Sequence, residues 1–248
     1  MIPVVRDVWA TFLAWAWFTL GFVFIFSWRY GVAVFAQDAE AAFQRLNHEF
    51  YQVFFRILRW AAPRHRWEID PEAMAIRSSV VLCNHLSYLD PLLLISLFER
   101  HATIVKPVFF SVPIFGGVLA RAGYLPADAS GRHGHLMIRR MDGMEAFLRS
   151  GGNLFVFPEG SRSRDGRLGG LNQGALKIAR LCKAPIVVLR LSGTNRLFPP
   201  GRFFFTAHQD NTIGLSVLAR IELEANGAPL SASELDDRVR QAYGQEAA

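Results

Sequence analysis

The chain has 248 residues, a length that suffices for one sizeable domain with an appendage. It is 51% hydrophobic and contains 21 phenylalanines, a composition that excludes a disordered protein. Its mean hydropathy of +0.19 is high for a soluble enzyme and low for a protein with many membrane spans, which favours a globular domain with one membrane segment. The net charge of +6 predicts an anionic partner, namely nucleic acid, anionic lipid headgroups or phosphorylated substrates.

The first predicted element is an apolar helix over residues 8–28, a run of 21 residues without a charge. At about 1.5 Å per residue it would be roughly 31 Å long, close to the thickness of the hydrocarbon core of a bilayer. Basic residues are more numerous after this run than before it, so the positive-inside rule places the main domain in the cytoplasm. Two alternatives stay open: a signal peptide cleaved after Ala36, and a helix that lies in the membrane interface without crossing it.

A second, amphipathic helix is predicted over residues 43–58, where apolar residues recur at helical spacing. Arg45, Arg56 and Arg59 interrupt or follow this pattern. Such a helix either packs on the domain or rests on anionic lipid through its arginines. Pro63 and the basic cluster after it indicate a boundary, which gives membrane-binding helices at 1–62 and a second domain at 63–248.

From Trp67 onward, short apolar runs alternate with helical patterns. The predicted strands are 79–83, 103–105, 153–157, 185–191, 202–206 and 215–223. The predicted helices are 91–100, 136–149, 171–183 and 233–243. This alternation predicts an α/β domain with a mainly parallel sheet flanked by helices. In such sheets ligands bind beyond the carboxyl ends of the strands.

The first candidate site follows the strand that ends at Cys83. His85 can take a proton from a substrate hydroxyl near neutral pH, and Asp90 can orient the imidazole if the chain turns into a helix between them. No GxSxG motif or other obvious nucleophile is present, which points to direct attack by a hydroxyl of the substrate. The alternative is structural: Asp90 caps a helix with Pro91 at its first position, or Ser87 and Asp90 form a capping box.

The second candidate site, FPEGSRS at 157–163, follows the strand over 153–157. Gly160 allows close approach of the backbone, and Ser161 and Arg162 can hydrogen-bond a phosphate. The surrounding region is strongly basic, with nine lysines or arginines opposed by Glu159 and Asp165: 162, 164, 167, 177, 180, 183, 190, 196 and 202. A solvated basic loop is the alternative, and no recognised nucleic-acid module accompanies the charge.

Taken together, NHLSYLD at 84–90 and FPEGSRS at 157–163 resemble the motifs of the glycerolipid acyltransferase family, in particular its bacterial 1-acyl-glycerol-3-phosphate acyltransferases. The resemblance implies an α/β acyltransferase domain preceded by membrane-binding helices, on the cytoplasmic side of the cell inner membrane. It further implies that His85, in this HX4D motif, acts as general base on the free hydroxyl of lysophosphatidic acid, with Asp90 orienting it. The acyl group would come from acyl-CoA or acyl carrier protein, without a metal or bound cofactor.

The resemblance also assigns the acceptor site. Glu159, Gly160, Ser161 and Arg162 would shape it, with Arg162 on the phosphate, and Lys106 matches a family lysine that lies near the phosphate. Neither Cys83 nor Cys182 has a role in this scheme, and both are expected to be ordinary buried thiols.

Two departures from the family pattern concern the acceptor more than the reaction. The second block usually ends in an arginine, whereas here 123–129 reads GYLPADA. Arg132 follows three residues later and is expected to bind the acceptor in place of that arginine. The fourth block, 185–189, lacks its usual second proline. A different lysolipid acceptor therefore stays an alternative, as does a membrane lipid-binding protein without catalysis. His133 and His135 are expected to be exposed in a glycine-rich loop and not to bind a metal.

Overall fold

A computed structural model describes residues 2–128, 131–163, 168–225 and 228–244. Seven strands form the main sheet, in the spatial order β1-β7-β6-β2-β5-β3-β4, and a separate hairpin is formed by β8 and β9. All neighbouring strands of the main sheet are parallel except β6 and β7. The predicted α/β fold with a mainly parallel sheet is therefore confirmed. The strands are β1 His65–Ile69, β2 Val80–Cys83, β3 His101–Val105, β4 Leu125–Pro126, β5 Asn153–Val156, β6 Ile186–Ser192, β7 Asn211–Ile221, β8 Glu224–Ala225 and β9 Ala228–Pro229.

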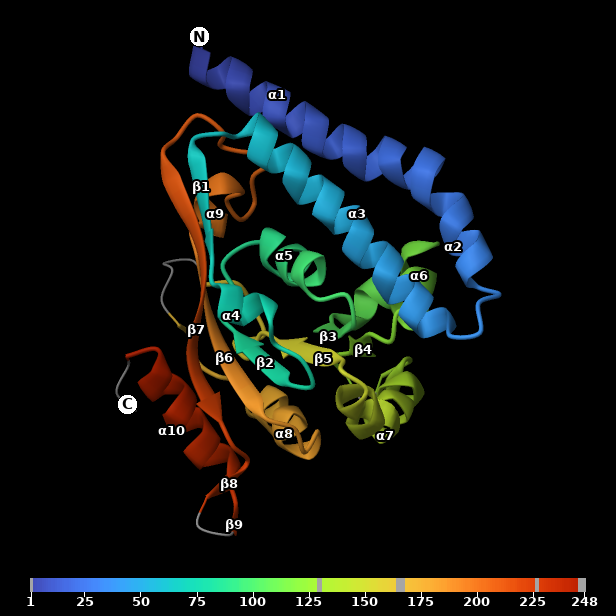
Figure 1. Cartoon of the computed structure of the whole chain (residues 1–248), viewed down its shortest axis with the longest axis vertical. Helices are drawn as coiled ribbons and strands as arrows, with labels where there is room; N and C mark the ends of the chain where they lie inside the picture. The colour runs from blue at the N-terminus through green and yellow to red at the C-terminus, as the bar shows by residue number, and fades with distance from the viewer. Residues whose placement is uncertain (1, 129–130, 164–167, 226–227, 245–248) are drawn as a thin grey trace.

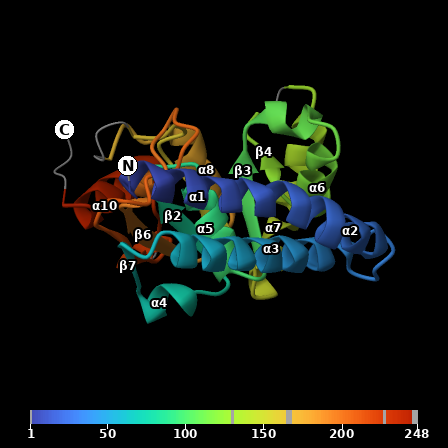
Figure 2. The same ribbon diagram turned by 90° about the horizontal axis from the view of Figure 1, so that it is seen from above.

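The helices cover both faces of this sheet, as Figures 1 and 2 show. On one face α5 lies between the sheet and α3, and a long helical rod made of α1, η1 and α2 packs along α3. On the other face lie α7, α8 and α10. The helical segments are α1 Ile2–Ala16, the π-helical η1 Trp17–Phe26, α2 Ser27–Ala33, α3 Ala39–Ala61, α4 Pro71–Met74, α5 Leu89–Leu97, the 3₁₀ segment η2 Pro107–Ser111, α6 Phe115–Arg121, α7 Gly134–Arg149, α8 Gln173–Leu181, α9 Thr194–Leu197 and α10 Ala232–Ala242.

The central strands are apolar throughout because they are covered on both sides. In β2, Val81 and Cys83 face the core beneath α3 and α5, whereas Val80 and Leu82 face the core beneath α7, α8 and α10. Alternate residues of β5 and β6 divide between the two cores in the same way. This alternation follows from the two-residue repeat of a strand. Because these strands run parallel, their carboxyl ends lie at one edge of the sheet.

The N-terminal rod is longer than the predicted apolar helix and lies flat on the domain. Its helix over Val4–Ala33 is long and apolar enough to cross a membrane. Near one end, however, the Asp7 carboxylate accepts from the backbone N–H of Ala207 at 2.7 Å. Near the other end, Arg29 pairs with Glu49 of α3 at 2.6 Å. Because both ends are attached to the rest of the chain, the rod runs along the domain surface and does not project away from it (Figure 1).

The predicted strand over residues 202–206 is wrong, because this segment forms a loop. Its aromatic side chains pack on α1 instead of joining the sheet. Phe203 stacks on Trp15 with ring centroids 5.5 Å apart, and the backbone N–H of Phe205 donates to the Thr11 hydroxyl at 2.9 Å. The next strand, β7, begins at residue 211, four residues before the predicted strand at 215.

A buried chain of hydrogen bonds ties the rod and α3 to the sheet. His101 lies in β3, where its Nδ1 contacts the Phe98 carbonyl oxygen at 2.7 Å and its Nε2 contacts the Tyr124 hydroxyl at 2.8 Å. Since a carbonyl only accepts, Nδ1 carries a proton, and burial keeps the ring neutral near pH 7 because it lowers the pKa of His101. Asn47 of α3 donates to Tyr124 at 3.2 Å and accepts from Tyr30 of the rod at 2.6 Å.

This network predicts a loss of stability in mild acid. Burial lowers the pKa of His101 from 6.5 to about 4, so between those values the unfolded chain binds a proton that the folded chain does not. The free energy of unfolding should therefore fall as pH decreases from 6.5 towards 4, by up to about 3 kcal/mol. Denaturant unfolding at pH 7 and at pH 4.5 measures this difference, and His101→Gln should reduce it. An equal pH dependence in the variant would contradict the prediction.

Candidate active site

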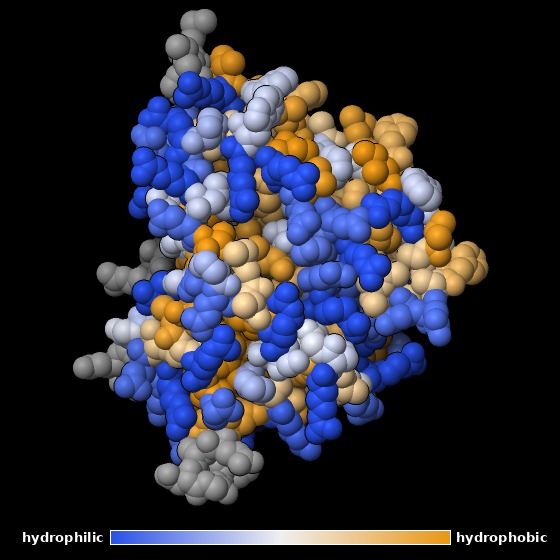
Figure 3. All heavy atoms as spheres, viewed as in Figure 1, coloured by the Kyte–Doolittle hydropathy of each residue, from blue (hydrophilic) through white to orange (hydrophobic). Residues whose placement is uncertain are grey.

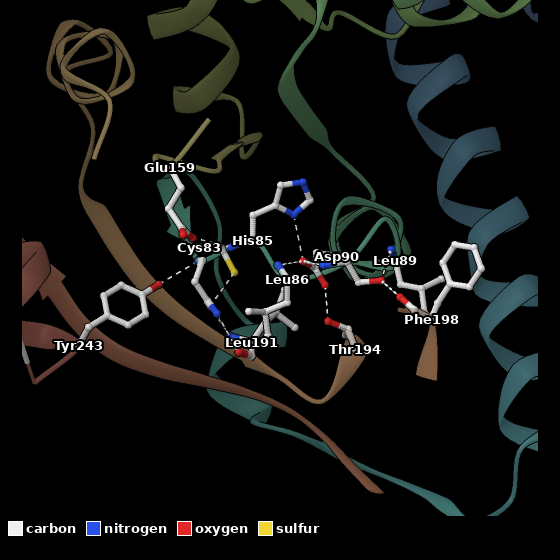
Figure 4. A network of polar contacts seen from close by, with 12 residues as sticks. Cys83, His85, Leu86, Leu89, Asp90, Glu159, Leu191, Thr194, Phe198 and Tyr243 are labelled. Carbon is white, nitrogen blue, oxygen red and sulfur yellow. Dashed lines mark hydrogen bonds and ion pairs between the residues drawn. The ribbon is translucent and has the colours of Figure 1, made fainter. Parts of the chain in front are cut away.

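His85 lies directly beyond β2, at the carboxyl edge of the parallel strands. The side-chain amide of Asn84, the residue between them, donates to the carbonyl oxygen of Leu191 at 2.9 Å and accepts from its N–H at 2.7 Å. The backbone N–H of Asn84 donates to the Tyr243 hydroxyl at 2.9 Å. These contacts continue the pairing of β2 with β6 past the strand end, so His85 leaves the sheet from a fixed point (Figure 4).

Asp90 orients the His85 ring. Its Oδ2 contacts Nδ1 of His85 at 3.0 Å and accepts from the backbone N–H groups of Leu86 and Ser87 at 2.5 and 2.7 Å. Its Oδ1 accepts from the Thr194 hydroxyl at 2.5 Å. A carboxylate only accepts hydrogen bonds, so Nδ1 carries a proton, and in the neutral form of the ring Nε2 holds the lone pair. The Asp90 side chain is fully buried and that of His85 is 17% exposed, and Figure 4 shows the second ring nitrogen directed away from Asp90.

The two structural alternatives for this segment have different outcomes. Asp90 is not the residue that caps α5, because the helix begins at Leu89 and its cap position is Tyr88. Only one of the two contacts of a capping box is formed: the Asp90 carboxylate accepts from the N–H of Ser87 at 2.7 Å. The Ser87 hydroxyl accepts from the N–H of Leu89 at 3.3 Å and not from that of Asp90, so the box is incomplete. The Asp90 carboxylate therefore contacts the backbone just before the helix and also holds the imidazole.

Cys83 lies immediately before this segment but offers no nucleophile. Its side chain is fully buried, and burial, reinforced by the charges of Asp90 and Glu159, raises the pKa of the thiol well above its usual range. The thiol therefore stays protonated and apolar in character. The His85 ring stacks on Phe157, with centroids 4.3 Å apart.

The second motif is tied directly to the first. Glu159 accepts from the backbone N–H of His85 at 2.9 Å through one oxygen, and from the N–H of Gly169 at 2.9 Å through the other. The N–H of Ser163 donates to the carbonyl oxygen of His85 at 2.7 Å. Gly160, at φ +66°, has a backbone conformation that favours glycine. Glu159 therefore acts within the loop, and it is not among the residues that line the cleft.

Arg162 and His85 line one cleft of about 430 Å³, together with Lys106, Gly160 and Ser161. The Arg162 guanidinium lies 3.5 Å from the centroid of the Tyr88 ring, an arrangement that holds its planar fork in place. Its Nε is buried and has no hydrogen-bond partner in the part of the chain that the structure describes. The N-terminal end of α8 also borders the cleft, and its partial positive charge favours an anion there.

Arg132 is not brought to this cleft. It is exposed just before α7 and is not one of the lining residues. Of the two histidines after it, His135 is exposed as expected, whereas His133 is half-buried and contacts the Ser111 hydroxyl at 3.4 Å. The second-block arginine of the family pattern therefore has no replacement at the cleft among these described residues.

An apolar cavity of about 490 Å³ adjoins the cleft. The two share part of their walls, including Tyr88, Val105 and Phe109. The cavity extends between the sheet and the helical pair, which consists of the N-terminal rod and α3, and its wall there is largely aromatic. Lining residues from the helical pair include Trp15, Phe18, Tyr51 and Phe54. The arrangement joins a basic, histidine-bearing cleft to a space suited to a hydrocarbon chain.

The comparison with protein families decides the membership of this chain. A family model described as acyltransferase matches residues 68–192. The chain belongs to the acyltransferase family. Among relatives, it is 34% identical over 132 residues to the 1-acyl-sn-glycerol-3-phosphate acyltransferase BAT2 of Brassica napus, a match that covers 53% of this chain and 38% of that protein.

Two further relatives carry the same kind of name. LPAT1 of Arabidopsis thaliana is 35% identical over 124 residues, covering 50% of this acyltransferase and 34% of that protein. A protein of Saccharomyces cerevisiae is 31% identical over 135 residues, covering 53% and 44%. The acyltransferase thus spans less than half the length of these relatives. The crystal structure of a 1-acyl-sn-glycerophosphate acyltransferase, PlsC, from Thermotoga maritima shares its fold, with a TM-score of 0.72, 20% identity and coverage of 97% of this chain and 95% of that one.

Sequence reasoning missed several residues that hold the site of this acyltransferase. Thr194 donates to Asp90 from a position 104 residues later, and Tyr243 hydrogen-bonds Asn84 from the far end of the described chain. Tyr88 supports Arg162 from within the first motif. Neither threonine nor tyrosine carries a distinctive local pattern, so no signal in the sequence points to the first two. Tyr88, three residues after the catalytic-site histidine, is the one of the three that could have been singled out from the sequence.

Proposed function

We propose that the chain is a 1-acyl-glycerol-3-phosphate acyltransferase, which transfers a fatty acyl group from acyl-CoA or acyl carrier protein to the free hydroxyl of lysophosphatidic acid and forms phosphatidic acid for phospholipid synthesis. The observation that carries the proposal is the shared cleft of His85, Arg162 and Lys106, with an apolar cavity beside it. The three named relatives are all called 1-acyl-sn-glycerol-3-phosphate acyltransferases, which supports the same reaction.

The chemical step follows from the His85–Asp90 contact. The free Nε2 of His85 takes the proton from the acceptor hydroxyl while the oxygen attacks the thioester carbonyl carbon. The buried Asp90 carboxylate stabilises the imidazolium that forms. The tetrahedral intermediate then collapses, the carbon–sulfur bond breaks, and the departing thiolate takes the proton from the imidazolium. We expect neither a metal nor a cofactor to take part, since the imidazole supplies the base and the thioester is already activated.

The acceptor is held at its two ends. Arg162 and Lys106 bind its phosphate, and the unpartnered Nε of Arg162 gains a hydrogen bond when the phosphate arrives. The acyl chain of the lysolipid or of the donor occupies the apolar cavity beneath the helical pair. Between these two ends, the free hydroxyl faces His85.

Arg162→Ala should raise the KM for lysophosphatidic acid by about tenfold and leave kcat within about threefold, because a phosphate contact made in both the ground state and the transition state contributes mainly to binding. Initial rates at varied acceptor concentration measure both constants. Arg139→Gln is the matched control, because Arg139 is an exposed arginine on α7 outside the cleft. An unchanged KM together with a large fall in melting temperature would assign Arg162 a structural role instead.

The proposal is tested by an acceptor panel with one labelled acyl-CoA and product identification by mass. We expect phosphatidic acid to be the main product when lysophosphatidic acid, other lysophospholipids and lyso-aminolipids are offered together. The exposed position of Arg132 is the observation that favours a second candidate, a lysolipid with another headgroup. Preferential acylation of such a lipid would replace lysophosphatidic acid as the acceptor, and binding of lysolipid without turnover would overturn the enzyme proposal.

We propose further that the rod lies in the membrane interface, with the catalytic domain on the cytoplasmic side of the inner membrane. Both ends of the rod are attached to the domain, and one long face of it exposes apolar side chains. Figure 3 shows hydrophobic residues at the surface along the edge where α1 and α2 run. The exposed large residues of this face include Val5, Trp9, Phe12, Leu20, Phe24 and Trp28.

Replacing two residues of this face with charges should release the protein from membranes. Phe12 and Phe24 are 61% and 72% exposed, so Phe12→Glu combined with Phe24→Glu leaves the core intact and removes two phenyl groups from the lipid. Because each buried phenyl group contributes about 2 kcal/mol, binding to vesicles should weaken at least about tenfold. Cosedimentation measures it, with Ile138→Glu on the distant α7 as control. Equal binding by the double variant and the control would contradict the interfacial placement.

A further inference from the structure

A second groove, of about 880 Å³, lies at the same edge of the sheet as the catalytic cleft. Asn84 and Leu86 line it, whereas His85 between them lines the cleft. The three-residue segment 84–86 therefore separates the two spaces. The remaining walls come from the carboxyl end of β6, the turn after it and the first residues of β1 and β7. The groove is thus adjacent to the reacting centre but does not belong to the acceptor cleft.

The charge of this groove is strongly positive. Four arginines line it, against the single carboxylate of Asp210, so its formal charge is 4 − 1 = +3. Arg64 pairs with Asp210. Arg190 donates to the carbonyl oxygen of Tyr243 at 2.7 Å, which leaves its charge unneutralised. The side chains of Arg66 and Arg196 are exposed, and neither guanidinium forms an ion pair or a hydrogen bond with any described residue.

One turn of the chain both lines the groove and contacts the catalytic site. The turn after β6 contains Gly193, at φ +75°, where an added Cβ would lie 2.1 Å from the carbonyl oxygen of Thr212. Only glycine fits there without moving β7. The next residue, Thr194, donates to Asp90, and Arg196 follows two residues later. A ligand held by Arg196 therefore rests on the same turn that supports the carboxylate behind His85.

We infer that this groove binds the nucleotide half of a coenzyme A thioester, an inference that rests on the proposed acyl transfer. That half carries a diphosphate and a 3′-phosphate, anions that arginine binds through paired N–H donors. The groove is concave and falls within the usual size range of ligand sites, about 300–1,000 Å³. Its position beside the segment 84–86 places the flexible pantetheine arm between the bound phosphates and the thioester at His85. The concave shape favours a small ligand over the convex surface of an acidic protein.

The test compares the wild type with the double variant Arg66→Gln and Arg196→Gln. Arg139→Gln serves as the control. Calorimetric titration with adenosine 3′,5′-bisphosphate measures binding to the groove without any turnover. Steady-state rates at varied acyl-CoA and varied lysophosphatidic acid measure the two KM values. We expect the double variant to bind the bisphosphate at least about tenfold more weakly and to raise the KM for acyl-CoA by a similar factor. We expect the KM for lysophosphatidic acid to stay within about twofold.

The other possible results show whether the nucleotide site, the proposed acyl transfer or both are wrong. If the wild type transfers acyl groups and the double variant has an unchanged KM for acyl-CoA, the inference fails and the proposed function stands. A raised KM for the lysolipid alone would make the groove part of the acceptor site and would also overturn it. A defect confined to acyl carrier protein as donor, with no bisphosphate binding, would make it a protein-docking surface instead. If no donor is consumed, the proposed function fails, and the titration still decides whether the arginines bind a nucleotide.

Discussion

Replacement of His85 with alanine is expected to lower kcat by about 10²- to 10⁴-fold, the contribution of a general base, without unfolding the protein. The ring is the only base at the cleft side of the first motif, so no neighbouring group takes over the proton. The fold should survive, because the Asp90 carboxylate keeps its hydrogen bonds from Leu86, Ser87 and Thr194 after the imidazole is removed. Initial rates with acyl-CoA and lysophosphatidic acid, beside thermal unfolding curves, measure the two effects.

The rate and the unfolding curve of the His85→Ala variant together decide the role of the imidazole. A His85→Ala variant that folds normally and keeps more than about a tenth of the wild-type rate would remove the imidazole from the mechanism. Phe157, whose ring stacks on His85, provides a control. Phe157→Leu keeps an apolar contact at the ring, and it should therefore lose far less activity than the histidine variant.

The second large effect is expected at Asp90. Asp90→Asn preserves the shape of the side chain but removes the negative charge that stabilises the imidazolium, so kcat should fall by about 10²- to 10⁴-fold. The amide can still be accommodated, since its oxygen can accept from His85, Leu86 and Ser87 while its NH₂ group faces the Thr194 hydroxyl. The loss of activity should therefore exceed what any loss of stability explains. Initial rates, with the melting temperature measured on the same preparation, check it.

Thr194→Val is the matched comparison for Asp90→Asn. It removes one hydrogen bond to the carboxylate, at Oδ1, but leaves the charge and the contact with His85 in place. Its kcat should decrease by about tenfold or less, the effect of one hydrogen bond. If Thr194→Val and Asp90→Asn lose the same activity, the position of the carboxylate and not its charge would be the important property.

The parts of the site that could be predicted are those encoded within short segments. His85 and Asp90 are five residues apart, and Arg162 follows a strand of recognisable composition. The rule that parallel strands end at one edge of a sheet was enough to place both motifs near one another. The contacts of Thr194 with Asp90 and of Tyr243 with Asn84 cross more than a hundred residues. Such contacts depend on the tertiary fold and leave no local trace in the sequence.

The errors in the predicted secondary structure have similar physical causes. The aromatic run at 202–206 has the composition of a strand, yet its rings find a partner in α1, so packing overrides local propensity. Strand β1 was missed because it lies at the edge of the sheet and exposes polar residues such as Arg66 and Glu68. Hydropathy alone does not distinguish a helix that crosses a bilayer from one that lies on it. The attachments of Asp7 and Arg29 to the rest of the chain are what supports the interfacial placement proposed above.

The shared acceptor site of His85 and Arg162 can be observed in a crystal structure of the wild-type protein with 1-acyl-glycerol-3-phosphate, in the absence of any acyl donor, because the acceptor cannot react alone. We expect the phosphate to contact Arg162 and Lys106, and the free hydroxyl to lie within hydrogen-bonding distance of Nε2 of His85, about 2.6–3.2 Å. A phosphate bound away from Arg162, or a hydroxyl out of reach of the imidazole, would contradict this expectation.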